Sequence, residues 1–260
     1  MAASAQWAAF PHPSKEFAYP GAKLRAAWPR LHAGDREPWP EAAGLQEAWR
    51  AFHRGDFKAA HDAGIALGPE GASVAVKAGG VHAVHLLDDE KLRLQRFQHL
   101  VAVAEAAIAA LPDVANTHFR RAFALGRYSQ GISVAKALQQ GLAGKVRESL
   151  ERTLELEPLH AEAHTALGLY HAEIIGKVGA MIGGVTYGAK AATGIAHLER
   201  ALELTPDAPI AHIEYGNGLM LLYGSKREDD AAAAYESAGR LVPRDAMEAL
   251  DVAFARSQLE

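Results

Sequence analysis

Apolar positions from Glu41 onward recur at the three-to-four-residue spacing of amphipathic helices, and proline ends each run. Five such runs end in turn at Pro69, Pro112, Pro158, Pro206 and Pro243. Proline stops a helix because it lacks the backbone donor and clashes with the preceding turn. These prolines lie 43, 46, 48 and 37 residues apart. Periods of this size in helical sequence indicate stacked helix pairs.

The first forty residues follow a different pattern. They hold half of all the prolines and a set of large aromatic residues: Trp7, Phe10, Phe17, Tyr19, Trp28 and Trp39. Proline removes helix donors, so the pattern predicts an extended arm over residues 1–40, with one short helix near Lys23–Trp28. Because disordered tails are poor in aromatics, we expect the arm to pack on the body, either as a cover for exposed core or in a functional role.

Within the body, residues 41–260, several segments carry a family resemblance. AEAHTALGLY (Ala161–Tyr170) and IAHLERALELTP (Ile195–Pro206) resemble the first and second helices of the tetratricopeptide repeat (TPR), a helix–turn–helix unit of about 34 residues. Further matches are RGDFKAAHDAGIALGP (Arg54–Pro69), APIAHIEYGNGL (Ala208–Leu219) and AAAAYESAGRLVP (Ala231–Pro243). The resemblance covers about residues 41–243. It implies an all-α solenoid of stacked antiparallel helix pairs, about five of them, with lengthened middle repeats and a C-terminal capping helix.

Individual residues fit this architecture. Gly168 and Gly216 stand where the motif needs a small residue, so we expect paired helices to approach closely there.

Aspartates follow two of the prolines, and another aspartate precedes the last helical run. Asp113 and Asp207 are predicted to cap the helices that follow them. Asp245, with Glu248 three residues later, is predicted to open a final helix that runs to about Gln258. That helix would close the apolar end of the solenoid.

Composition narrows the function classes. The net charge of −4 provides no basic face for nucleic acid. The absence of cysteine excludes disulfides, thiolate metal sites and a cysteine nucleophile. The start, MAASAQWAAFPHPSKEF, lacks the pattern of a signal peptide, and no apolar run reaches the ~18 residues that a membrane span needs. We therefore expect a cytoplasmic protein without a membrane span.

The glycine-rich stretch GKVGAMIGGVTYGAKAATG, Gly176–Gly194, raises the question of a phosphate-binding loop. Such a loop needs a lysine directly after its last glycine, and then a serine or threonine. Gly183 and Gly188 have the right spacing, but an alanine separates Gly188 from Lys190, and Ala191 replaces the hydroxyl. The glycines are better interpreted as positions of close helix packing or sharp turns.

The repeat that contains this stretch is longer than the TPR unit of about 34 residues, and residues 174–194 form the insertion. The repeat before it has an insertion at Ser129–Lys145. Equivalent insertions in neighbouring repeats lie side by side, so we expect these two to touch. The contact is either extended packing between lengthened hairpins or a small pocket or partner surface. The side chains available for such an insertion surface are Lys136, Lys145, Lys177, Tyr187 and Lys190.

No catalytic or metal-binding constellation emerges from the pattern. The histidine pair in LHAEAH lacks the glutamate that follows the first histidine in H-E-x-x-H. His118, His164 and His212 share one position relative to the proline of each repeat, which favours a repeated packing role. Carboxylates in apolar settings, such as Glu105 and Glu214, have no nucleophile or base beside them in the sequence. We expect no metal, no cofactor and no catalysis.

The resemblance also implies a binding surface. In TPR proteins the first helices line a concave groove for extended or helical peptides. The matching positions here are Asn116, Phe119, Phe123, Glu162, Thr165, Leu169, Ile210, Ile213, Asn217 and Met220. The alternative for the large apolar members is a core role. The set lacks the lysines with which family members clamp the carboxylate of chaperone tails, and it suits an apolar or amphipathic peptide, or the arm itself.

Together these features predict a non-catalytic protein-interaction scaffold or adaptor, with a protein or peptide partner. The alternative is a helical-repeat receptor for a small ligand that uses the insertions at residues 129–145 and 174–194.

Overall fold

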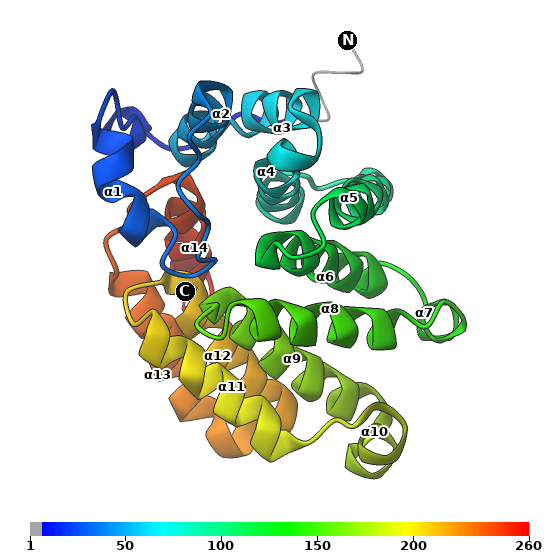
Figure 1. Ribbon diagram of the computed structural model, residues 1–260. Helices are drawn as coiled ribbons and strands as arrows, with labels where there is room; N and C mark the ends of the chain where they lie inside the picture. Colours follow the sequence, from blue (N-terminus) through cyan, green and yellow to red (C-terminus); the bar gives the residue numbers. More distant parts are fainter. Residues whose placement is uncertain (1–6, 260) are drawn as a thin grey trace. The chain divides into compact units, whose positions relative to one another are not determined.

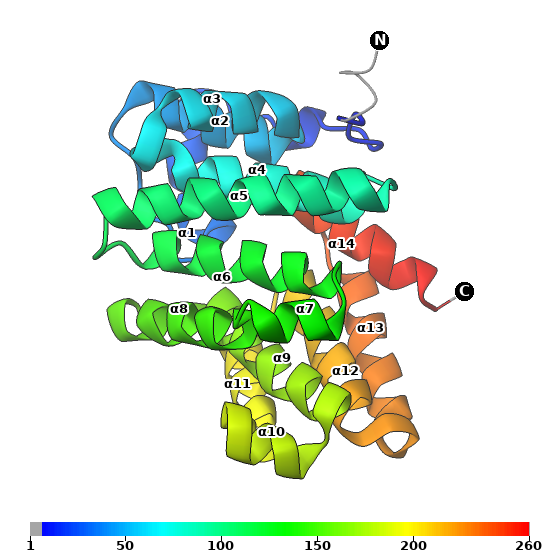
Figure 2. The same ribbon diagram turned by 90° about the vertical axis from the view of Figure 1, so that its right-hand side faces the viewer.

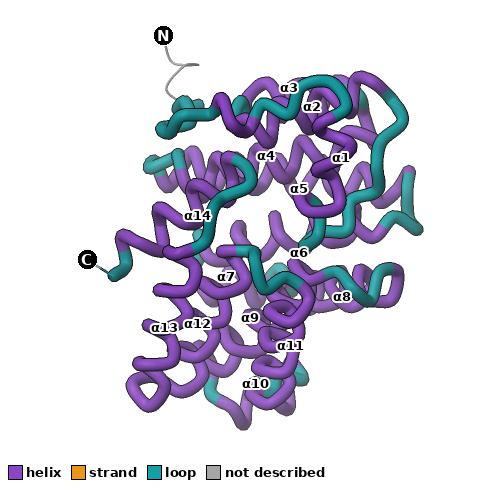
Figure 3. The backbone as a smooth tube through the Cα atoms, turned by 90° about the vertical axis from the view of Figure 1, so that its left-hand side faces the viewer, coloured by secondary structure: helices purple, strands orange, loops and turns teal. Residues whose placement is uncertain are grey.

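The computed structural model describes residues 7–259, which form helices joined by loops, with no strand in that range (Figures 1 and 3). The first helices of the pairs are α2 (Ala43–Arg54), α4 (Ala72–His85), α6 (Ala115–Gln130), α9 (Ala161–Val178) and α12 (Pro209–Tyr223). Their partners are α3 (Phe57–Ala66), α5 (Glu90–Ala110), α8 (Leu142–Leu156), α11 (Ala191–Leu204) and α13 (Glu228–Arg240). The remaining elements are η1 (Lys15–Phe17), α1 (Lys23–Leu31), η2 (Gly68–Gly71), α7 (Val134–Gln139), α10 (Ala180–Tyr187), η3 (Gly224–Arg227) and α14 (Ala246–Ser257). The predicted all-α fold of stacked helix pairs is confirmed.

The prolines mark helix ends as the sequence predicts. Helices α5, α8 and α11 each end two residues before a proline, at Pro112, Pro158 and Pro206. The predicted aspartate caps on the next helices are wrong. Val114 and Ala208 occupy the N-cap positions of α6 and α12, and neither helix has a side-chain cap.

The last helix begins and ends close to the predicted residues, but its opening aspartate has a different partner. Glu248 accepts a hydrogen bond from the backbone N–H of Arg244, at 2.7 Å. Asp245 Oδ2 lies 2.7 Å from Nδ1 of His53, and both side chains are buried. A contact 192 residues apart in sequence therefore fixes the start of α14.

The chain divides into two compact units. Unit 1 comprises the residues up to Leu31, Glu37–Leu156 and Asp245–Met247. Unit 2 comprises His32–Arg36, Glu157–Arg244 and the residues from Glu248 onward. The predicted arm therefore contributes to both units, and its residues 1–6 lie outside the described residues.

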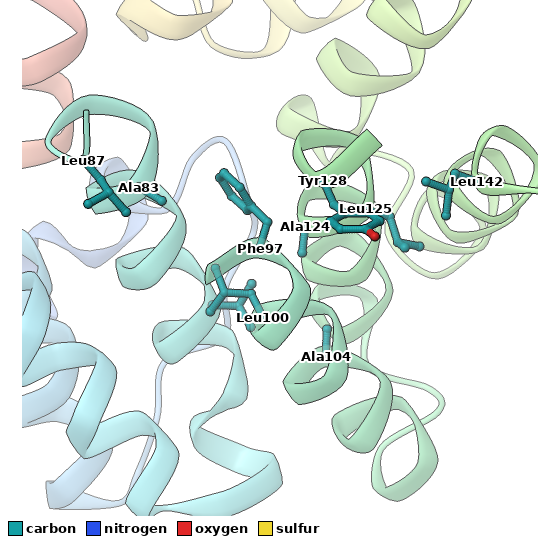
Figure 4. Packing of buried hydrophobic residues seen from close by; sticks show 10 residues of the cluster. Ala83, Leu87, Phe97, Leu100, Ala104, Ala124, Leu125, Tyr128 and Leu142 are labelled. Carbon is teal, nitrogen blue, oxygen red and sulfur yellow. The ribbon is translucent and has the colours of Figure 1, made fainter. Parts of the chain in front are cut away.

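The core of unit 1 forms around α5, which lies beside α4 and α6 (Figures 1 and 2). Figure 4 shows Phe97 and Leu100 of α5 between Ala83 of α4 and Ala124 of α6. Leu100 is fully buried, and burying one such side chain stabilises a fold by roughly 1.5–3 kcal/mol. Small residues on the neighbouring helices make room for the large side chains of α5.

The N-terminal aromatic residues pack on unit 1. Helix α1 covers the predicted short helix and extends three residues beyond it, and it buries Leu24 and Trp28. The indole of Trp28 meets those of Trp39 and Trp49 edge-to-face, with ring centroids 5.0 and 5.8 Å away. Such pairs add to the stabilisation from burial alone. The expectation that the aromatic arm packs on the body is confirmed for these residues.

In unit 2 the helix pairs approach closely at glycines. A Cβ placed on Gly168 of α9 would lie 2.8 Å from the backbone oxygen of Gly194 and 2.6 Å from Cγ of Leu198, both on α11. A Cβ on Gly216 of α12 would meet Tyr235 and the oxygen of Ala231 on α13 at 3.0–3.1 Å. The predicted close approach at Gly168 and Gly216 is confirmed.

Candidate interaction surfaces

The three predicted groove residues of unit 1 lie on α6, and all are engaged inside the unit. Phe119 is buried. The half-buried Phe123 packs on Phe97 and against the backbone at Gly80. Asn116 is buried too, and its side-chain amide donates a hydrogen bond of 2.7 Å to Glu37 Oε2.

Glu37, which follows α1, is the centre of a buried polar network. The same Oε2 atom accepts a hydrogen bond of 2.6 Å from Ser73 Oγ on α4. The guanidinium of Arg120, itself buried, lies 3.9 Å from Oε2 and donates a hydrogen bond to Ser73 Oγ. The backbone oxygen of Glu37 accepts the indole N–H of Trp28 at 2.8 Å. A carboxylate from the arm thus joins the first helices α4 and α6 of unit 1.

In unit 2 the predicted groove residues lie on two first helices that pack on each other. Glu162, Thr165 and Leu169 are on α9; Ile210, Ile213, Asn217 and Met220 are on α12. Thr165 and Ile213 are buried, Leu169 and Ile210 are half-buried, and Met220 is 41% exposed. The backbone N–H of Glu162 donates to the oxygen of Gly34, so the arm also contacts the start of α9.

Asn217 belongs to a network that joins α12 to α13. Its amide donates to Glu214 Oε2 at 2.8 Å, and its Oδ1 accepts from the hydroxyl of Tyr235 at 2.6 Å. Burial, followed by the negative charge of Glu214, raises the pKa of Tyr235. Since the hydroxyl stays protonated, it donates throughout the physiological range.

The repeated histidines have a more specific role than packing. His118, His164 and His212 each lie near a proline carbonyl six residues earlier, with Nε2–O distances of 2.7, 3.1 and 2.8 Å. A carbonyl only accepts, so Nε2 carries the proton in each case. The hydrogen bond ties the turn after one second helix to the next first helix. The constant spacing from the proline is the sequence signal for it.

This tautomer determines a second contact in unit 2. Nδ1 of His164 lies 2.8 Å from Nδ1 of His197, so the neutral His164 accepts and His197 donates. Burial, with the charges of His164 and His171, lowers the pKa of His197 to about 4. Across residues 7–259, no group of three or more histidine, aspartate or glutamate side chains has metal-holding geometry.

An open groove of about 840 Å³ lies in unit 1 between α5, α6 and α8, and its charged lining was not anticipated from the sequence. Arg121 donates to Ser149 at 2.9 Å and pairs with Glu105, one of the carboxylates singled out in the sequence. Arg152 pairs with Asp113 at 3.0 Å. The lining contains five carboxylates and three arginines, so ion pairs neutralise part of the charge and the groove keeps a net negative charge.

The arm also inserts a tryptophan among cationic and imidazole groups of unit 1. The guanidinium of Arg96 lies 3.9 Å from the ring centroid of Trp7, a cation–π contact. The ring of His82 is 4.5 Å from the same indole, and that of His61 is 5.2 Å. His82 is fully buried. Burial, followed by the charge of Arg96, lowers the pKa of His82 to about 4.

This cluster predicts that acid destabilises unit 1. Since an unfolded histidine has a pKa near 6.5, the unfolded chain binds a proton before folded His82 does. The His82 contribution to stability is therefore present above pH 6.5, and it is lost as pH falls toward 4. At pH 5 we expect a loss of about 2 kcal/mol in the free energy of unfolding.

Denaturant titrations at pH 7 and pH 5 measure this loss. All four tryptophans of the chain lie in unit 1, so their fluorescence reports that unit. His82→Gln should flatten the pH dependence, whereas the matched change at the exposed His12 should leave it unchanged. Equal pH dependence in the two variants would show that His82 is not responsible.

The insertions form two short helices. In the chain, helix α7 follows α6 and precedes α8 in unit 1, and α10 follows α9 and precedes α11 in unit 2. Each lies at the end of its helix pair (Figure 1). Lys136, Lys145, Lys177 and Lys190 are exposed, whereas Tyr187 is half-buried and its backbone oxygen accepts the hydroxyl of Tyr170. Since the insertions belong to different units, their mutual contact stays a prediction. The glycine-rich stretch is helical, with Gly188 in a left-handed conformation as the C-cap of α10.

Comparisons with known proteins agree with this architecture. The chain is similar to the crystal structure of a thermophilic TPR protein from Thermus thermophilus, with a TM-score of 0.57 and 16% sequence identity. The match covers 82% of this chain and 97% of that one. No protein-family model and no curated protein matches the sequence. The chain therefore has a TPR-like fold.

No helix within residues 7–259 combines the length and the apolar character needed to cross a bilayer.

Proposed function

We propose that this protein is a non-catalytic interaction scaffold that binds a peptide or partner protein on the first helices of its repeats. The TPR-like fold supports this, since the fold typically serves protein interaction rather than catalysis. The specific surface we propose is the face of α9 and α12 in unit 2. The cytoplasmic location predicted from the sequence is part of the same proposal.

The observation that carries the choice of surface is the burial pattern of the candidate groove residues. In unit 1 the amide of Asn116 is held by Glu37, so the arm already occupies that part of α6. In unit 2, α9 and α12 pack together and leave Leu169, Ile210 and Met220 partly accessible. An accessible apolar face across two adjacent helices suits an amphipathic segment.

The small-ligand alternative needs an enclosed cavity beside the insertions. Tyr187 is only half-buried, and α10 exposes Met181 and Val185 to solvent. Ligand sites are concave and bury most of their ligand. The exposure of α10 therefore favours the scaffold.

Site-directed crosslinking tests the proposal. The chain has no cysteine, so Met220→Cys gives a single attachment point for a photoreactive group. Val242→Cys, at a residue 83% exposed in the same unit, is the matched control. Each conjugate is illuminated in lysate of the source cell, and crosslinked proteins are identified by mass spectrometry.

We expect a defined protein partner to crosslink from position 220 at several times the yield from position 242. Leu169→Glu should abolish that product without changing the melting temperature by more than a few degrees, since Leu169 is only half-buried. Equal yields at both positions would count against a site on α9 and α12.

A further inference from the structure

The short insertion helix α10 presents a marked apolar surface. Met181 is 81% exposed and Val185 is 87% exposed, and Ile182 is exposed beside them. Gly183 is its only buried residue among those described. Three large apolar side chains on one eight-residue helix are more than the scattered exposure normal for a protein surface.

The charge around α10 is one-sided. No aspartate or glutamate occurs between Glu173 and Glu199, whereas Lys177 and Lys190 stand on either side of the helix. Both lysines are exposed, and only Lys177 forms an ion pair within residues 7–259, with Glu173 at 3.1 Å. A local excess of positive charge in a chain of net charge −4 is a specific feature of this segment.

Helix α7, the other insertion, repeats the same chemistry in unit 1. Val134 and Leu138 are exposed, and none of its residues is buried. The acid-free sequence here runs from Val114 to Arg147 and includes the exposed Lys136 and Lys145. Like α10, α7 connects the first and second helices of its pair.

We propose that α10 docks on an anionic membrane surface, through a chemistry that α7 repeats within unit 1. Interfacial binding needs exposed apolar side chains that enter the lipid boundary and lysines that attract acidic headgroups. Glycines bound the helix: Gly179 and Gly188 have positive φ, so the chain turns sharply at both ends of α10. The turns let α10 fold back against the end of α9, where Gly183 is buried, and leave Met181, Ile182 and Val185 exposed.

A lipid surface fits better than a protein partner. Stable protein interfaces bury about 800 Å² on each side, and their cores favour aromatic residues, methionine and arginine and are depleted in lysine. Met181 suits either partner, but the other exposed large apolar residues of the two short helices are isoleucine, valine and leucine, and the neighbouring cations are lysines. A fluid interface needs no shape complementarity from the protein.

Fluorescent labelling of the cysteine-free chain tests the proposal directly. Val185→Cys carries an environment-sensitive fluorophore on α10, and Val242→Cys carries it at a residue of similar exposure. Each protein is titrated with vesicles of phosphatidylcholine alone and of phosphatidylcholine with phosphatidylglycerol. We expect a blue shift with anionic vesicles at position 185 and none at position 242.

Co-sedimentation supplies the affinity. Binding to anionic vesicles should exceed binding to neutral vesicles by about 25-fold, because Lys177 and Lys190 each contribute roughly a factor of five near the surface. Met181→Glu with Val185→Glu should reduce it by about tenfold or more. Leu159→Glu with Val242→Glu adds the same charge at two exposed apolar residues outside α10 and should change binding by less than about twofold.

Two results would overturn the proposal. One is an equal loss in the Leu159 and Val242 variant, which would mean that net charge alone governs binding. The other is no binding to either vesicle by the unmodified chain. A protein crosslinked from position 185 in that case would assign the apolar surface of α10 to a protein partner. Crosslinking from position 220 tests the surface on α9 and α12, so neither result decides the proposed scaffold function.

Discussion

Replacing Glu37 by alanine is expected to lower the free energy of unfolding of unit 1 by about 3–5 kcal/mol. The carboxylate accepts hydrogen bonds from Ser73 and Asn116 and lies 3.9 Å from the guanidinium of Arg120. All three partners are buried. Without Glu37, the buried guanidinium of Arg120 loses a neighbouring negative charge, and the buried donors of Ser73 and Asn116 lose this acceptor.

A matched control separates this network from a general loss of charge. Glu41 is exposed and lies four residues along the same segment, so Glu41→Ala removes the same charge without disturbing a buried group. We expect it to change stability by less than about 0.5 kcal/mol. Glu37→Gln keeps an acceptor oxygen but removes the charge, and should fall between the two. Denaturant titration followed by tryptophan fluorescence reports unit 1 directly.

If Glu37→Ala were as stable as Glu41→Ala, the Glu37 network would have little part in stabilising unit 1. The large loss would instead mean that the arm is a structural part of this unit. Removing the arm to expose a groove would then unfold unit 1. For this reason the crosslinking experiment uses the whole chain.

Local features of the sequence predict the helices well. A proline cannot continue the backbone hydrogen bonding of the helix before it, so Pro112, Pro158 and Pro206 correctly predicted the ends of three helices. The helices of one repeat pack closely where one of them carries a small residue, and that residue has a fixed position in the repeat. The sequence therefore identified Gly168 and Gly216 as the positions of close approach. The aspartate caps failed because α6 and α12 begin one residue later than expected, with Val114 and Ala208 at their N-caps.

Contacts between distant segments could not be predicted in the same way. Asn116 has the sequence position of a groove residue, but its amide contacts Glu37, 79 residues earlier. The pairing of His53 with Asp245 spans 192 residues. Each pair is a single contact between two distant residues. It therefore produces no periodic pattern in the sequence from which it could be predicted. The exposed face of α10 was missed because apolar sequence alone does not distinguish a buried helix from an exposed one.

The close helix packing of unit 2 leads to the second large expected effect. Gly168→Val is expected to cost about 3 kcal/mol or more in the free energy of unfolding. The first added carbon would already lie 2.8 Å from the backbone oxygen of Gly194, which cannot rotate away. It would also displace Leu198, whose side chain is buried between Gly168 and Gly218.

Gly126→Val provides the control, since Gly126 also lies inside a helix but has open space where its Cβ would stand. At this position the substitution changes only the helix propensity, which is higher for valine than for glycine. We expect the free energy of unfolding to rise by less than about 0.5 kcal/mol. Far-ultraviolet circular dichroism during thermal unfolding compares the two variants. If Gly168→Val had the same melting temperature as the unmodified chain, α9 and α11 would have to lie further apart than the distances from Gly168 to Gly194 and Leu198 indicate.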